Sequence, residues 1–190
     1  MWKVEPVPME VYLSENAFVG LLVSTVEVYR RECFGILLGH READRIMVDF
    51  VVPYQSAVRK FQEVHMDWHR SQRVAEAVRA TTRWELVGDY HSHPMYGEKK
   101  ATTKLSRTDH QDFRDDGTSI IVAINDGHRQ QHWGYVKGGL ISGSINGYSI
   151  RLAAYHKDSE AVVRVPLVCP YALGFMAKTK GPSSVEVRPQ

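Results

Sequence analysis

Cysteine is nearly absent from this sequence, since only Cys33 and Cys169 occur among its 190 residues. The two lie far apart and outside any CxxC motif, which excludes a disulfide framework and a cysteine-based zinc finger. No apolar run approaches the roughly 18 residues that a membrane-spanning helix needs. The first residues also lack the apolar stretch and small-residue cleavage site of a signal peptide. We therefore expect a cytoplasmic protein without a membrane partner.

An excess of charge of one sign is also missing, because 24 basic residues stand against 22 acidic ones and the formal net charge is +2. Nucleic-acid-binding proteins usually show a clustered basic face, so we expect no nucleic-acid partner. Apolar residues make up 43% of the chain, which is typical of a globular protein. We expect a single domain over residues 1–180 and a flexible C-terminal tail over 181–190.

Helical and extended patterns alternate along the chain. Apolar residues at helical spacing behind a candidate N-cap, Ser14, predict a helix over 15–30. The other elements that we expect are strands over 33–38 and 45–52, a helix over 67–81, a strand over 86–91, a loop over 94–104, a helix over 106–115, a strand over 119–125, its hairpin partner over 131–136 and a last strand over 150–155. This order is typical of an α/β sandwich with a mixed sheet.

The segment His91-Ser92-His93-Pro94 is the first candidate for chemistry. Side chains alternate faces along a strand, so His91 and His93 point the same way and can hold two corners of a tetrahedral zinc site. Pro94 places the pair near a strand end. Taken alone, the pattern also fits two surface histidines on a strand.

Ser106 and Asp109 form the second candidate pair, because residues three apart share one face of a helix. Asp109 offers a hard oxygen ligand and Ser106 a hydroxyl donor. Ser106 is equally suited to cap the helix, and both roles are compatible. His110 and Asp112 remain alternative ligands at this stage.

Glu32 is the third candidate, directly before the apolar run Cys33–Leu38. A glutamate at a strand end is often only an exposed residue. A metal site with three protein ligands and an open fourth position, however, needs a base for its water.

Taken together, Glu32 with Gly35-Ile-Leu-Leu-Gly39, then His91-Ser-His93-Pro94, then Ser106-x-x-Asp109, resemble the JAMM (MPN-plus, JAB) zinc metalloprotease family. The pieces follow the family's order, and the resemblance extends over about residues 7–155. One difference is a longer loop, residues 95–105, between the histidines and the serine. We expect no accessory domain, and in this respect the sequence resembles the small stand-alone prokaryotic members of the family.

This resemblance implies an α/β/α sandwich with a curved mixed sheet, similar to cytidine deaminases, and one Zn²⁺ per chain. It implies that His91, His93 and Asp109 bind the zinc with water as fourth ligand. Glu32 would take the proton of that water and pass it to the leaving amine, and Ser106 would hydrogen-bond the oxyanion.

The resemblance also implies the substrate, an amide or isopeptide bond after the C-terminal tail of a ubiquitin-like protein. Proteins like E1 and E2 of a bacterial conjugation or defence system are then expected partners. Tyr90 and Tyr96 flank the histidines and are candidates to line the groove for this tail, which could dock by strand addition. Alternative functions are a peptidase acting on a sulfur-carrier protein and a non-catalytic scaffold of the same fold.

Overall fold

The computed structural model describes residues 9–54, 58–60, 63–65, 68–127, 129–158 and 161–174. Its helices are α1 (Glu15–Glu27), α2 (Trp68–Thr81), α3 (Arg107–Asp112) and α4 (Pro170–Gly174). Its strands are β1 (Glu10–Leu13), β2 (Phe34–Arg41), β3 (Arg45–Pro53), β4 (Val58–Lys60), β5 (Glu63–His65), β6 (Glu85–Pro94), β7 (Thr118–Asp126), β8 (Gly134–Val136), β9 (Leu140–Ile145), β10 (Tyr148–Lys157), β11 (Val162–Val165) and β12 (Leu167–Val168).

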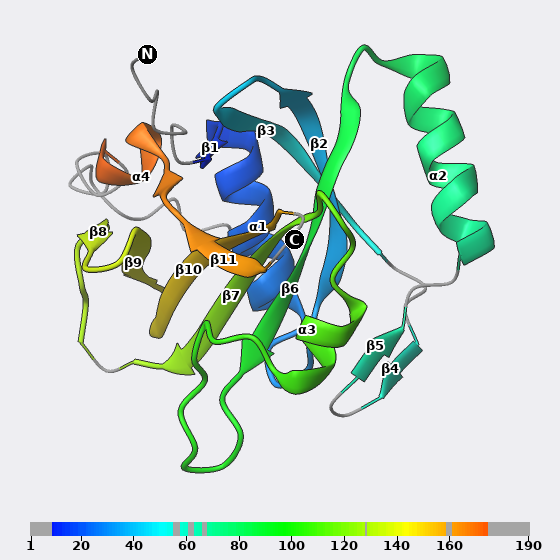
Figure 1. The fold of residues 1–190 in the computed structure, drawn as a ribbon. Coiled ribbons are helices and arrows are strands. Elements are labelled where there is room, and N and C mark those ends of the chain that lie inside the picture. Colours follow the sequence, from blue (N-terminus) through cyan, green and yellow to red (C-terminus); the bar gives the residue numbers. More distant parts are fainter. Residues whose placement is uncertain are drawn as a thin grey trace, which may run out of the picture.

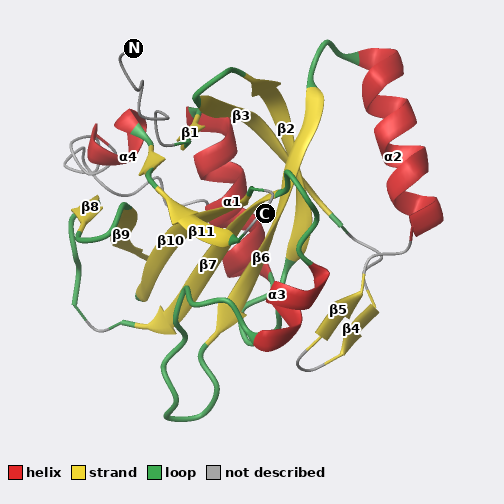
Figure 2. Cartoon of the chain, viewed as in Figure 1, coloured by secondary structure: helices red, strands yellow, loops and turns green. Residues whose placement is uncertain are grey.

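A mixed, curved sheet forms the centre of the fold (Figures 1 and 2). Its strand order is β12-β1-β3-β2-β6-β7-β10-β9-β8, and β11 joins it beside β10. The pairs β1–β12, β1–β3 and β6–β7 are parallel, whereas the remaining pairs of this sheet are antiparallel. Strands β4 and β5 form a separate hairpin. The predicted α/β class with a curved mixed sheet is confirmed.

Helix α1 covers one face of this sheet. The side chain of Ser14 accepts a hydrogen bond from the Ala17 N–H, which confirms the predicted N-cap. Phe18, Leu21 and Leu22 are buried against the strands, as the apolar spacing indicates. The helix ends at Glu27 instead of residue 30, because Arg30 adopts a left-handed conformation with φ of 78°.

The opposite face has much thinner helical cover. In Figure 1 the six-residue helix α3 lies in front of β6 and β7, whereas α1 lies behind them. Helix α2 stands apart from the sheet, and its Val74, Ala75 and Val78 are only half-buried. This uneven cover leaves space between the sheet and the segment around α3, and that space is where the candidate site lies.

Two sequence-based expectations about strands are wrong. Strand β7 has β6 and β10 as neighbours, so residues 131–136 are not its hairpin partner. Instead β8 pairs with β9 at the end of the sheet, and β9 itself was not expected. This strand is buried over most of its length, and Trp133 packs directly on its Gly143. Strand β6 also continues to Pro94, beyond the expected end at residue 91.

The predicted C-terminal tail, 181–190, lies outside the described residues, as does 175–180. The apolar stretch Val165–Met176 is expected from the sequence to pack in the core or an interface as a final strand or helix. Its described part contains the short strand β12 and the helix α4, after the end of β11 at Val165. Among the described helices, none combines the length and the apolar character needed to cross a membrane.

Candidate metal centre

Strand β6 presents one row of polar side chains to the face that α3 covers. Asp89, His91 and His93 are alternate residues of this strand, so all three point to this face. Tyr90 and Ser92 alternate with them and point into the core under α1. The side chains of His91 and His93 are 13% and 18% exposed, which leaves them within reach of a ligand.

Helix α3 brings Asp109 over the two imidazoles. The Nε2 atoms of His91 and His93 are 3.1 Å apart. His91 Nε2 lies 3.3 Å from Asp109 Oδ1, and His93 Nε2 lies 3.6 Å from Asp109 Oδ2. The ligand atoms of a tetrahedral zinc ion with bonds of about 2.0–2.1 Å are about 3.3 Å apart. The three side chains therefore fit the donor set and the spacing of a zinc site.

The charges in this group favour a cation. Burial alone would raise the pKa of Asp109, but hydrogen bonds to His91 and His93 outweigh it and hold that pKa well below its usual range. Burial alone would lower the pKa of His93, but the Asp109 carboxylate and the Thr102 carbonyl outweigh it and raise the value. A carboxylate thus faces two imidazoles, which together offer the oxygen and nitrogen donors that a divalent cation binds.

A reciprocal capping box at the start of α3 fixes the position of Asp109. Its backbone N–H donates to Ser106 Oγ over 3.1 Å, and the Ser106 N–H donates to Asp109 Oδ2 over 2.5 Å. The predicted capping role of Ser106 is therefore confirmed, and the same segment borders the cavity, whereas the role of Ser106 in a reaction stays a prediction. The alternatives His110 and Asp112 follow on the same helix but are not part of the group of potential metal ligands found among the described residues.

Glu32 lies at the same cavity as the two histidines and is half-buried. Its position depends on a tie between β2 and β6. The Cys33 N–H donates to the Ser92 Oγ over 2.9 Å, and the Ser92 N–H donates to the Cys33 carbonyl over the same distance. These two bonds join the chain directly after Glu32 to the residue between His91 and His93. Glu32 therefore borders the cavity of the two histidines, and its charge adds to the raised pKa of His93.

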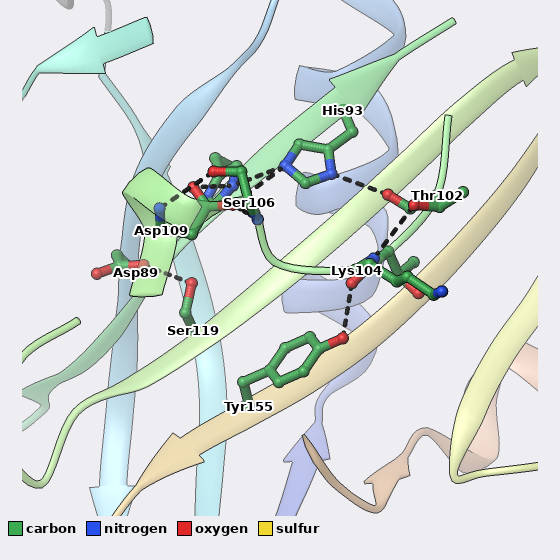
Figure 3. Close-up of polar contacts among 10 residues, drawn as sticks. Asp89, His93, Thr102, Lys104, Ser106, Asp109, Ser119 and Tyr155 are labelled. Carbon is green, nitrogen blue, oxygen red and sulfur yellow. Dashed lines mark hydrogen bonds and ion pairs between the residues drawn. The ribbon is translucent and has the colours of Figure 1, made fainter. Parts of the chain in front are cut away.

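The cavity that adjoins these groups has a volume of about 520 Å³. Its wall is mixed, with apolar side chains such as Phe34, Ile36 and Phe113 and charged ones such as Arg41 and Arg114. Asp89 lies on its floor and accepts a hydrogen bond of 2.7 Å from the Ser119 hydroxyl (Figure 3). Burial raises the pKa of Asp89, although this hydrogen bond opposes the shift. The sequence analysis missed Asp89, although its spacing from His91 could have revealed it.

The prediction that Tyr90 lines a substrate groove is wrong. Its side chain is completely buried, and its hydroxyl donates to the Ser24 Oγ of α1 over 3.0 Å. Alternation along β6 explains this result, because a residue between two site histidines must point to the opposite face. Tyr96 is 60% exposed on the loop after β6, so its contact with a substrate stays a prediction.

Strand β6 pairs with β7 over Asp89–Pro94 and with β2 as far as His91. Strand addition on the β7 side of the histidines is therefore closed. Docking of a tail by strand addition elsewhere stays a prediction.

Comparison with known proteins gives a family and a fold. A family model described as prokaryotic homologs of the JAB domain matches residues 15–135. No curated protein matches the chain. Among solved structures, the chain is similar to the solution structure of protein DSY2949 from Desulfitobacterium hafniense, with a TM-score of 0.56 and 18% identity over 84% of this chain and 92% of that one. At this identity the likeness shows the fold alone. Because the family model covers well over half of the sequence, the chain belongs to the prokaryotic homologues of the JAB domain.

Proposed function

We propose that this protein is a zinc-dependent isopeptidase or peptidase that hydrolyses the amide bond after the C-terminal tail of a ubiquitin-like protein. The observation that carries the proposal is the convergence of His91, His93 and Asp109 at one cavity that Glu32 and Ser106 also line. Proteins like E1 and E2 of the same conjugation system are the partners that this function implies.

The zinc would be held by His91 Nε2, His93 Nε2 and the Asp109 carboxylate, with a fourth position open. When bound, such an ion supplies Lewis acidity and lowers the pKa of a water molecule to about 7. The carboxylate of Glu32, which borders the same cavity, would accept the proton of the attacking water and return it to the leaving nitrogen. Each amide hydrolysed consumes one water and releases a carboxylate and an amine.

Ser106 can serve the oxyanion because its capping bond uses only the acceptor side of the hydroxyl. Oγ accepts from the Asp109 N–H, so the hydroxyl proton remains available for donation. A donor aimed at a developing oxyanion contributes on the order of 3 kcal/mol to lowering the barrier. The cavity walls formed by Phe34, Ile36 and Phe113 exclude water on one side and can hold an extended apolar or small-residue tail.

Metal content and cleavage, measured together, test the proposal. Purified wild-type protein should contain one zinc per chain by mass spectrometry and should cleave a ubiquitin-like fusion after a diglycine-type tail. Asp109→Asn should lose both properties, whereas the matched variant Asp112→Asn, three residues further along the chain, should keep the zinc. Glu32→Gln should keep the zinc and lose cleavage.

Each other outcome has a clear meaning. Zinc binding without cleavage of any ubiquitin-like fusion, but with cleavage of a sulfur-carrier fusion, would replace the proposed substrate. Zinc binding without hydrolysis of either class would indicate a non-catalytic scaffold. A wild-type protein that binds no zinc would overturn the metal centre itself.

A further inference from the structure

The imidazole of His93 is oriented by a backbone carbonyl from the loop that follows β6. Its Nδ1 lies 2.8 Å from the carbonyl oxygen of Thr102 (Figure 3). A carbonyl only accepts hydrogen bonds, so Nδ1 must carry the hydrogen. Nε2, which points to His91 and Asp109, then keeps its lone pair in the neutral ring and is free to bind a metal.

Two half-buried side chains of the sheet bind the backbone on either side of Thr102. Asn125, near the end of β7, accepts a hydrogen bond of 2.7 Å from the Ala101 N–H and donates one of 3.2 Å to the Ala101 carbonyl. Its side-chain amide thus makes both bonds that a neighbouring strand would make. Tyr155 of β10 donates from its hydroxyl to the Thr103 carbonyl over 2.8 Å. The residues on both sides of Thr102 are therefore anchored to the sheet.

We propose that Asn125 and Tyr155 are positioning residues of the metal site, which fix the Thr102 carbonyl against Nδ1 of His93 and thereby the direction of its Nε2. The inference rests on the proposed zinc centre. Neither side chain belongs to the group of potential metal ligands or lines the cavity, so each acts through the loop backbone. The sequence next to the histidines does not indicate these contacts of Asn125 and Tyr155.

The length of the loop explains why such anchors are needed. Residues 95–105 separate β6 from the helix cap at Ser106, and most of them are exposed or half-buried. A loop of this length has many conformations of similar free energy unless side chains restrict it. Thr103 is an exception, since it is only 7% exposed, and it lies where the hydroxyl of Tyr155 reaches the backbone. Met95 also donates to the Ile124 carbonyl at the start of the loop, whereas Asn125 and Tyr155 anchor the residues around the carbonyl that contacts His93.

Outer contacts that orient a metal-binding histidine typically change metal affinity by 10–100-fold when they are removed. We therefore expect Asn125→Ala to weaken zinc binding by about 10–100-fold, measured by competition with a chromophoric chelator. Tyr155→Phe removes one hydroxyl and keeps the ring, so its loss should have the same direction and be smaller. Tyr148→Phe, on the same strand β10 but packed on Tyr29, is the matched control and should bind zinc like the wild type.

A second measurement separates orientation from stability. In the zinc-loaded wild type, NMR of ¹⁵N-labelled histidine should show a His93 Nδ1–H that exchanges slowly with water. In Asn125→Ala this signal should exchange faster or disappear, and thermal unfolding should show that the protein remains folded. If Asn125→Ala does not fold, Tyr155→Phe decides the question, because its ring still fills the same space.

Wild-type zinc affinity and a protected Nδ1–H in both Asn125→Ala and Tyr155→Phe would overturn this inference and leave the proposed function intact. A wild-type protein without zinc affinity would instead overturn the proposed function and the positioning role together.

Discussion

The hydroxyl of Ser92 supports the site more than its position between two histidines suggests. It is fully buried, and its Oγ accepts the Cys33 N–H over 2.9 Å. Ser92→Ala leaves that backbone N–H without a partner in the core, which costs about 1–3 kcal/mol. For a chain of this size, 1 kcal/mol corresponds to a change in Tm of about 2–4 °C.

Ser142 provides a matched control for this prediction. It is also buried, at 2% exposure, but its Oγ has no hydrogen-bond partner among the described residues. Ser142→Ala should therefore leave the free energy of unfolding unchanged or raise it slightly, because it removes a buried hydroxyl that is unsatisfied. Urea denaturation of both variants, with similar m-values, gives the comparison directly.

The same experiment has a functional readout. The hydrogen bonds between Cys33 and Ser92 hold the backbone next to Glu32. Ser92→Ala should therefore lower cleavage more than it lowers zinc content. Equal losses of stability in Ser92→Ala and Ser142→Ala would refute the reasoning, because they would show that the hydrogen bond to Cys33 contributes nothing specific.

Three further outcomes are expected. Ser106→Ala should cost about 1 kcal/mol of stability and should lower kcat. Zinc should remain bound, because the backbone N–H of residue 106 still donates to Asp109. Loss of zinc by mass spectrometry would contradict this prediction. Cys33 and Cys169 should not react with a thiol reagent in the native protein, since both are buried and burial raises the pKa of Cys169. Both should react in denaturant. A rapid reaction in the native protein would show that the core opens. Tyr90→Phe should reduce stability by about 0.5–1.5 kcal/mol without changing KM, and a higher KM would restore Tyr90 to the substrate groove.

Features that depend on neighbouring residues could be predicted from the sequence. Ser14 caps α1 and Ser106 caps α3 because a serine oxygen satisfies an N–H only three residues away. His91 and His93 share a face because side chains of a strand alternate. The same alternation places Tyr90 in the core, and the prediction that Tyr90 lines a substrate groove is wrong because it disregards this alternation. Local rules therefore defined the candidate ligands and the fold class.

Strand pairing could not be predicted in the same way, and the surroundings of the site depend on it. Strand β7 pairs with β10 and not with the nearer segment 131–136, because pairing depends on which strand edges are free in the assembled sheet. Asn125 reaches Ala101 across 24 positions of sequence, and Tyr155 reaches Thr103 across 52. Periodicity and capping rules extend over a few residues only. The sequence by itself determined the candidate side chains for a metal site, because strand alternation and helix spacing are local, whereas only the tertiary structure decided that His91, His93 and Asp109 converge and what holds them in place.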